Sequence, residues 1–184
     1  LIKLQAEKFS SKPALISDME ILSFSDLDNL SSNIAYHLIN LGVSHGDRVA
    51  IWAPNMNEWV LAAIAIHKAG GVLVPINTRM KGKEAAYILN NAQAKILFSV
   101  QNFLGTDYFK MLEKEDLPDL QCQISLDESD ANDSIQSFGR LREQSSKVEL
   151  PQVNETDMAD IIFTSGTTGK PKGVISSHLQ NIKV

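Results

Sequence analysis

A stretch rich in glycine and hydroxyl residues, at positions 163–174, constrains the fold of this chain more than any other feature of its sequence. Its glycines allow positive φ and a close approach of the backbone to a ligand. Its hydroxyl and ammonium groups supply hydrogen-bond donors and positive charge, which suit a polyphosphate. Residues 159–163 and 173–175 are rich in β-branched side chains and predict flanking strands. The pattern favours a phosphate-binding loop between two strands, and an ordinary surface turn is the alternative that composition leaves open.

This stretch departs from the Walker A motif of P-loop kinases and GTPases. That motif requires a glycine, four further residues, and then glycine, lysine and serine or threonine. Here Gly169 and Lys170 are followed by Pro171, and Thr164 stands at the leading position. The sequence therefore disfavours that class of nucleotide-binding protein.

The run from Thr164 to Gly173 resembles the signature loop of the adenylate-forming superfamily, which comprises acyl-CoA synthetases, peptide-synthetase adenylation domains and firefly luciferase. Residues 68–79 are similar to a second block of fatty-acyl-type CoA ligases, so the resemblance covers nearly the whole chain. It implies an α/β fold in which residues 1–184 form the N-terminal part of the large adenylate-forming domain. The implied sheet is mainly parallel and flanked by helices, with the signature loop between two strands near the C-terminus. The rest of that domain and the small C-terminal domain are expected to be absent.

For the full-length protein, the resemblance implies ATP-dependent activation of a carboxylic acid, fatty or related, through an acyl-adenylate to an acyl-CoA thioester. ATP and coenzyme A are the implied co-substrates, and Mg²⁺ is the implied metal, with ligands mostly outside this stretch. No catalytic residue is expected here, because the catalytic lysine and the magnesium-positioning carboxylate of relatives lie further along, so the fragment alone is expected to be inactive. The implied nucleotide-binding residues are Thr164, Ser165, Gly166, Thr167, Thr168, Gly169, Lys172 and His178.

Two alternatives to the acyl-CoA ligase remain: a peptide-synthetase adenylation domain, and a nucleotide-binding scaffold that has lost the chemistry. Residues 74–79 resemble acyl-CoA ligases more than peptide synthetases. Lys170 ranks below Lys172 as a phosphate ligand, because the family is less strict at that position. His178 has two equally supported roles, lining the nucleotide site or packing at the start of a helix that Ser177 and Gln180 would cap.

The rest of the chain alternates between apolar strands and amphipathic helices, which is typical of an α/β fold. The unalternating apolar run at 72–74 predicts a strand covered on both faces, and therefore a parallel sheet. Ser25 and Asn55 are the predicted N-caps of the first two long helices. Gly42 is predicted to end the first of these helices. Further strands are predicted at 14–17, 48–52, 96–99 and 121–126, further helices at 84–91 and 103–112, and a polar linker at 144–157.

Residues 42–46 match Gly-x-Ser-x-Gly, the nucleophile elbow of α/β-hydrolases. That elbow requires a strand before the serine and a helix after it. Here the predicted helix comes before Ser44 and the predicted strand after it. The segment is therefore predicted to be a helix-to-strand turn.

Composition excludes several kinds of partner and site. The net charge of −5 disfavours nucleic acid and anionic membranes as partners, and no apolar run reaches the ~18 residues of a transmembrane helix. The single Cys122 excludes an internal disulfide and indicates a reducing, cytoplasmic location. The histidines lack zinc-ligand spacing, and the acidic stretch at 115–139 lacks the glycine and glutamate of a calcium loop, so no metal site is predicted. Apolar surface left exposed by missing sheet partners is expected to favour self-association into a homo-oligomer.

Overall fold

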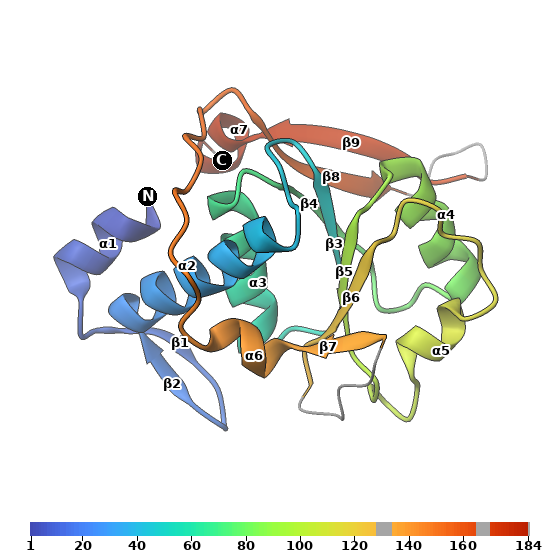
Figure 1. The fold of residues 1–184 in the computed structure, drawn as a ribbon, viewed down its shortest axis with the longest axis horizontal. Coiled ribbons are helices and arrows are strands. Elements are labelled where there is room, and N and C mark those ends of the chain that lie inside the picture. Colours follow the sequence, from blue (N-terminus) through green and yellow to red (C-terminus); the bar gives the residue numbers. More distant parts are fainter. Residues whose placement is uncertain (128–133, 165–169, 184) are drawn as a thin grey trace.

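In the computed structural model, which describes residues 1–127, 134–164 and 170–183, a seven-stranded sheet lies between two layers of helices (Figure 1). The strand order is β7-β6-β5-β3-β4-β8-β9. Every neighbouring pair is parallel except β8 and β9, which form an antiparallel hairpin. The strands of this sheet are β3 (Arg48–Trp52), β4 (Val72–Pro75), β5 (Ile96–Ser99), β6 (Cys122–Ser125), β7 (Ile135–Ser137), β8 (Met158–Thr164) and β9 (Lys172–Ser177).

The helices divide between the two faces of the sheet (Figure 1). Helices α2 (Phe24–Asn40), α3 (Asn57–Lys68) and α6 (Phe138–Arg142) lie on one side, and α4 (Gly82–Ala92) and α5 (Tyr108–Leu112) on the other. The remaining elements are α1 (Ile2–Phe9), which packs on α2, the hairpin of β1 (Pro13–Ile16) and β2 (Ile21–Ser23), and α7 (His178–Ile182) after β9. This arrangement confirms the predicted α/β fold with a mainly parallel sheet.

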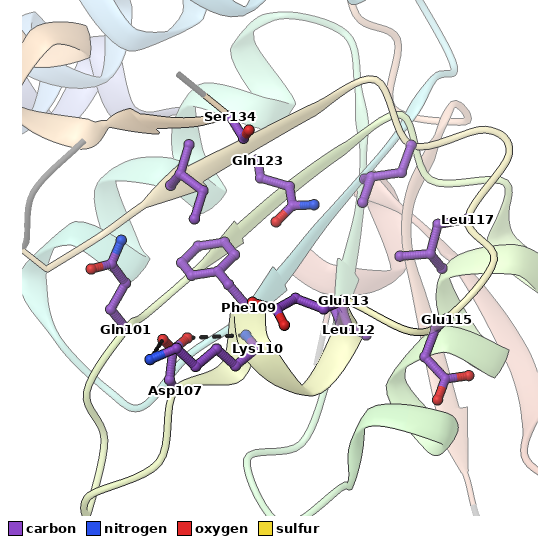
Figure 2. A pocket seen from close by; sticks show the side chains of 12 residues that line it. Gln101, Asp107, Phe109, Lys110, Leu112, Glu113, Glu115, Leu117, Gln123 and Ser134 are labelled. Carbon is purple, nitrogen blue, oxygen red and sulfur yellow. Dashed lines mark hydrogen bonds and ion pairs between the residues drawn. The ribbon is translucent and has the colours of Figure 1, made fainter. Parts of the chain in front are cut away.

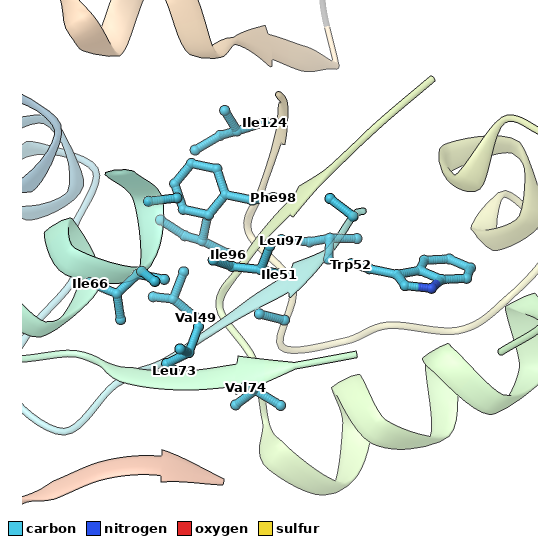
Figure 3. Packing of buried hydrophobic residues seen from close by; sticks show 14 of the residues in the cluster. Val49, Ile51, Trp52, Ile66, Leu73, Val74, Ile96, Leu97, Phe98 and Ile124 are labelled. Carbon is cyan, nitrogen blue, oxygen red and sulfur yellow. The ribbon is translucent and has the colours of Figure 1, made fainter. Parts of the chain in front are cut away.

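Burial on both faces explains why the central strands of the sheet are unbroken apolar runs in the sequence. Val49, Ile51 and Trp52 of β3 are fully buried, although successive side chains point to opposite faces of the sheet. In Figure 3, Val49 and Ile51 lie on the side of Phe98 of β5 and Ile66 of α3. Trp52 points to the other face of the sheet, where its ring stacks on that of Tyr108 in α5. A strand whose two faces are both covered needs apolar residues at every position. The predicted parallel sheet follows from this burial.

The helix termini correct two of the predicted caps. Helix α2 is capped by Ser23, whose hydroxyl accepts a hydrogen bond from the Asp26 backbone N–H, and not by Ser25, which lies inside the helix. Helix α3 follows Met56, which makes no side-chain cap, so Asn55 does not cap it. Both predictions placed the cap three residues before an acidic residue, Asp28 or Glu58. Ser23 and Asp26 have the same spacing, and it is Ser23 that has the extended backbone of an N-cap.

The end of α2 agrees with its prediction. Gly42 has φ of 93°, and the amides of Gly42 and Val43 donate to the carbonyls of Ile39 and Leu38. This is a Schellman motif, in which glycine supplies the left-handed residue. The turn then leads into β3, so Ser44 follows a helix and precedes a strand, in the order opposite to a nucleophile elbow.

Helix α5 is shorter than its predicted range. It begins at Tyr108, because residues 103–106 form an isolated bridge between Phe103 and Thr106, with Leu104 and Gly105 at positive φ. Asp107 then caps the helix by accepting from the Lys110 N–H. The predicted linker at 144–157 has no helix or strand, as expected.

The β8–β9 hairpin lies at the edge of the sheet and leaves apolar side chains exposed. Ile162 and Val174, which stand opposite each other in the register, are 49% and 53% exposed. This confirms the expected exposed apolar surface, while self-association stays a prediction. Among the described residues, no helix is long and apolar enough to cross a membrane.

A polar cluster fixes the base of this hairpin to α3. The carboxylate of Asp160, in β8, lies 3.0 Å from Nε2 of His67 in α3 and accepts a hydrogen bond from the side-chain amide of Asn181 in α7. Burial alone would raise the pKa of Asp160, but these hydrogen bonds outweigh it and hold the pKa below its ordinary value. The cluster therefore joins three elements through one buried carboxylate.

His178 completes the cluster with its ring centroid 5.0 Å from that of His67. Partial burial, together with the nearby His67 and His45, lowers the pKa of His178 despite the opposing charges of Asp160 and Asp157. The neutral imidazole is thus the form that the folded protein prefers.

The His178 pKa predicts a pH dependence of stability. Because the folded-state pKa lies below the unfolded value of about 6.5, the unfolded chain binds more protons as pH falls through that value, and the free energy of unfolding falls with it. Urea unfolding of the full-length protein between pH 5 and 7.5 measures this slope, where Asp160 stays ionised. We expect His178→Gln to reduce it, and an unchanged slope would contradict the role given to His178.

Candidate nucleotide-phosphate site

The open end of the β8–β9 hairpin places two predicted phosphate-binding residues opposite each other. Thr164, the last residue of β8, pairs in the register with Lys172, the first residue of β9. The antiparallel ladder between them is continuous from Asp160 onward, so a hydroxyl and an ammonium group stand on facing strand ends. Ser165, Gly166, Thr167, Thr168 and Gly169, which were also predicted to bind phosphate, lie outside the described residues.

Gly173 allows the two strands to pack closely beside this opening. A Cβ atom at Gly173 would lie 2.9 Å from Cγ2 of Ile161 and 3.3 Å from Cζ of Phe163. The first distance is shorter than normal van der Waals contact, so any larger residue would displace these side chains. Phe163 therefore covers the glycine of β9, and the geometry of the opening depends on that close approach.

A concave surface adjoins the opening on the side of α4. This hollow has a volume of about 400 Å³. It is lined by residues of α4 and of both hairpin strands, among them Tyr87, Asn91, Phe163, Pro171 and Lys172. Lys172 thus lines a recess. Tyr87 and Asn91 were not predicted as site residues, because nothing in a helical pattern shows which part of the chain a helix face will contact.

The ammonium groups of Lys170 and Lys172 differ in their surroundings. Neither forms an ion pair with a carboxylate in the part of the chain that the structure describes. The Lys170 ammonium lies over the ring of Tyr87, 5.8 Å from its centroid, whereas no aromatic ring contact is found for Lys172 within those ranges. Lys172 is therefore a cation without a counter-charge, as a phosphate ligand requires.

The structure does not bring His178 together with Lys172. Lys172 is the first residue of β9 and His178 is the first residue after it, so six residue steps, or roughly 20 Å at about 3.3 Å per residue, separate them along the strand. Ser177 caps α7 and forms a capping box with Gln180, as predicted, and this cap holds His178 in the Asp160 cluster at the hairpin base. A nucleotide-binding role for His178 stays a prediction, and its observed contacts are those of the packing alternative.

A larger hollow lies at the other end of the sheet, beside α5 and β6 (Figure 2). Its volume is about 910 Å³, and its lining includes Asp107, Lys110, Glu113 and Glu115. Lys110 pairs with Asp107 at 3.5 Å, so the free charges of this surface are acidic. Of the predicted nucleotide-binding residues, the three that the structure describes, Thr164, Lys172 and His178, do not line it, and its acidic charge disfavours phosphate.

The described residues offer no metal centre at the hairpin opening. Within them, no group of three histidine, cysteine or acidic side chains is placed to hold a metal ion. The nearest acid of the hairpin, Asp160, is already bonded to His67 and Asn181 at its base. The residues present at the opening therefore do not fit Mg²⁺, which prefers carboxylate oxygens.

Comparisons with known proteins identify the family of this chain. The family model of AMP-binding enzymes matches residues 2–183. A methyl-dioxo-octahydroindenyl-propanoyl:CoA ligase of Rhodococcus jostii is 36% identical over the whole chain, which covers 38% of that protein. The crotonobetaine/carnitine–CoA ligase of Salmonella typhi is 31% identical over 92% of the chain and 32% of its own length.

Among solved structures, an anthranilate CoA ligase in complex with anthranoyl-AMP superposes with a TM-score of 0.87 and 28% identity, over 96% of this chain and 34% of that one. The chain thus spans about a third of the length of these relatives. The match of the family model over nearly every residue shows that this chain belongs to the AMP-binding enzyme family.

Proposed function

We propose that this chain is the N-terminal part of an AMP-forming acyl-CoA ligase, with residues 1–184 contributing the phosphate-binding hairpin of the large domain. The single observation that carries the proposal is the hairpin itself, which sets an unpaired Lys172 opposite Thr164 beside a recess. Family membership and the names of the relatives, which are CoA ligases, support the same activity.

The proposed reaction has two steps. In the first, a carboxylate oxygen of the acid attacks the α-phosphorus of ATP, the bond from that phosphorus to the bridging oxygen breaks, and pyrophosphate leaves with the bond electrons. In the second, the thiol of coenzyme A attacks the acyl carbon and AMP leaves. Negative charge grows on the leaving pyrophosphate in the first step, so groups that hold the β- and γ-phosphates stabilise that transition state.

The residues of this chain act on those terminal phosphates. The Lys172 ammonium supplies a point charge, and the Thr164 hydroxyl donates a hydrogen bond from the facing strand. The backbone and hydroxyl groups of residues 165–169 are proposed to complete the set of donors. Mg²⁺, when bound, would neutralise part of the phosphate charge, and we assign its ligands to the remainder of the protein.

The substrate acid is proposed to be aliphatic or alicyclic, a fatty or related acid. The curated relatives act, by their names, on an octahydroindenyl-propanoyl group and on crotonobetaine or carnitine, which differ widely in shape.

A cytoplasmic location fits the single Cys122, whose pKa is raised by burial so that the thiol stays protonated and unreactive. The peptide-synthetase and scaffold alternatives are separated from the ligase by the assays below.

The first prediction concerns the reaction. In the full-length protein, we expect exchange of labelled pyrophosphate into ATP that depends on a carboxylic acid, and acyl-CoA formation when coenzyme A is added. The isolated 184-residue chain is expected to show neither. Exchange without transfer to coenzyme A would favour a peptide-synthetase domain, and ATP binding without exchange for any acid would favour the scaffold.

The second prediction concerns Lys172. Replacing it with methionine removes the unpaired cation while keeping much of the side-chain length, and we expect kcat/KM for ATP in the exchange reaction to fall about 10²-fold. Lys83→Met, on the exposed side of α4, is the matched control and should leave the rate unchanged. Equal rates for the two variants would contradict the proposed role of Lys172.

The third prediction concerns Gly173. Ala in its place would press against Ile161 and Phe163, and such overpacking costs about 1–3 kcal/mol or shifts the strand. We therefore expect Gly173→Ala to raise KM for ATP and to lower the thermal unfolding midpoint. Gly139→Ala is the control, because its Cβ would lie 3.4 Å from the Ser137 hydroxyl, an ordinary contact.

A further inference from the structure

Tyr87 lies where α4 meets the strand that leaves the proposed phosphate site. Its hydroxyl donates to the carbonyl oxygen of Pro171 across 3.4 Å, a long hydrogen bond. Its ring also lies beneath the ammonium of Lys170, 5.8 Å from the centroid, within the range of a cation–π contact. One side chain therefore contacts two consecutive residues immediately before β9.

The helix that carries Tyr87 is held firmly against the rest of the molecule. Ala85, Ile88 and Leu89 are buried against the sheet. At the start of the helix, a Cβ on Gly82 would lie 2.2 Å from the Met111 carbonyl oxygen, so α4 and α5 pack with no space between their backbones. Tyr87 is thus carried by a helix packed on the core, and it links that helix to Lys170 and Pro171.

Lys170 and Lys172 are two residues apart and both carry a positive charge beside the same opening. Only Lys172 begins the strand that pairs with Thr164. Lys170 is exposed, and the contact that the structure gives its ammonium is the Tyr87 ring. The two cations therefore have different partners, one of which belongs to α4.

We propose that Tyr87 is a positioning residue, which holds Lys170 and Pro171 against α4 and so fixes the start of β9 with Lys172 facing the terminal phosphates of ATP. The inference rests on the proposed function for the identity of the ligand. In this arrangement Lys170 is an anchor and not a phosphate ligand. If either side chain of the contact is removed, the first residues of β9 can move, and Lys172 is no longer preorganised to face the phosphates.

The test is a double-mutant cycle on the full-length protein, with the Kd for ATP measured by calorimetry. Tyr87→Leu removes the ring and the hydroxyl, and Lys170→Gln removes the cation. A cation–π contact of ordinary strength predicts that each change weakens ATP binding about twofold to fivefold. Because both changes break one contact, we expect the double variant to bind no more weakly than the weaker single variant.

Two further variants and one kinetic measurement make the double-mutant cycle specific. Tyr87→Phe keeps the ring and should retain its coupling to Lys170. Lys83→Gln, an exposed lysine of the same helix, should leave the Kd unchanged. In the exchange reaction, Tyr87→Leu and Lys170→Gln should raise KM for ATP while kcat stays within about twofold, because the contact acts on binding. Lys170→Gln alters only an exposed side chain, so an unchanged Kd for this variant overturns the proposal even if Tyr87→Leu folds poorly.

The outcomes separate this inference from the proposed function. The positioning role is overturned if the fold-changes in the Kd for ATP multiply in the double variant. It is also overturned if either Tyr87→Leu or Lys170→Gln leaves that Kd unchanged. An effect of Lys170→Gln alone would show that Lys170 binds phosphate directly. If the wild-type protein binds ATP but catalyses no exchange, the proposed reaction fails while the cycle in Kd still decides the role of Tyr87. A wild-type protein that binds no ATP would overturn both.

Discussion

Strand β8 is the element on which the rest of this structure depends, because it pairs in two directions at once. On one side it continues the parallel sheet through the pairing of Leu73 with Asp160, and on the other it forms the antiparallel hairpin with β9. The parallel side is set by a buried apolar core that no single side chain controls. The antiparallel side carries Thr164 and Lys172 to the same opening. The proposed site is therefore positioned by the sheet, with Thr164 on β8 and Lys172 on the edge strand β9.

The hairpin is held differently at its two ends. At the base, the carboxylate of Asp160 is bonded by His67 and Asn181, so β8, α3 and α7 are joined through a buried polar cluster. At the opening, the contacts from α4 are the long hydrogen bond and the ring contact of Tyr87. The base is therefore held by a buried carboxylate, and the described part of the opening is linked to α4 by one aromatic side chain.

Much of the fold could be predicted from local sequence. The apolar runs of β3 and β4 require burial on both faces, and the glycine after α2 requires a left-handed residue, so the parallel sheet and the Schellman motif follow from short windows. The caps at Ser25 and Asn55 were wrong because each was chosen for an acidic residue three positions later, a spacing that Ser23 and Asp26 also have and that Asn55 shares without capping α3. The length of α5 depended on a turn at Leu104 and Gly105, for which the apolar pattern carried no signal.

The candidate site was predictable only in part. The glycine- and hydroxyl-rich stretch predicts flanking strands at 159–163 and 173–175, and both strands are found, with Thr164 paired with Lys172 at their ends. Tyr87 and Pro171, however, are far apart in sequence, as are His67 and Asp160, and no local pattern indicates that such residues meet. The sequence thus predicts which residues bind phosphate, and that assignment stays a prediction. The contacts of Tyr87 and His67 with the hairpin depend on the packing of α3 and α4 against the sheet.

The central claim is that the β8–β9 opening binds the terminal phosphates of ATP, and hydrogen exchange of the full-length protein with ATP or AMP tests it most directly. AMP lacks the β- and γ-phosphates, so the account predicts that ATP slows amide exchange in peptides covering residues 163–174 and that AMP does so much less. Peptides from α5 and β6 should be unaffected by either nucleotide. Equal protection of residues 163–174 by ATP and AMP, or no protection by ATP, would contradict the account.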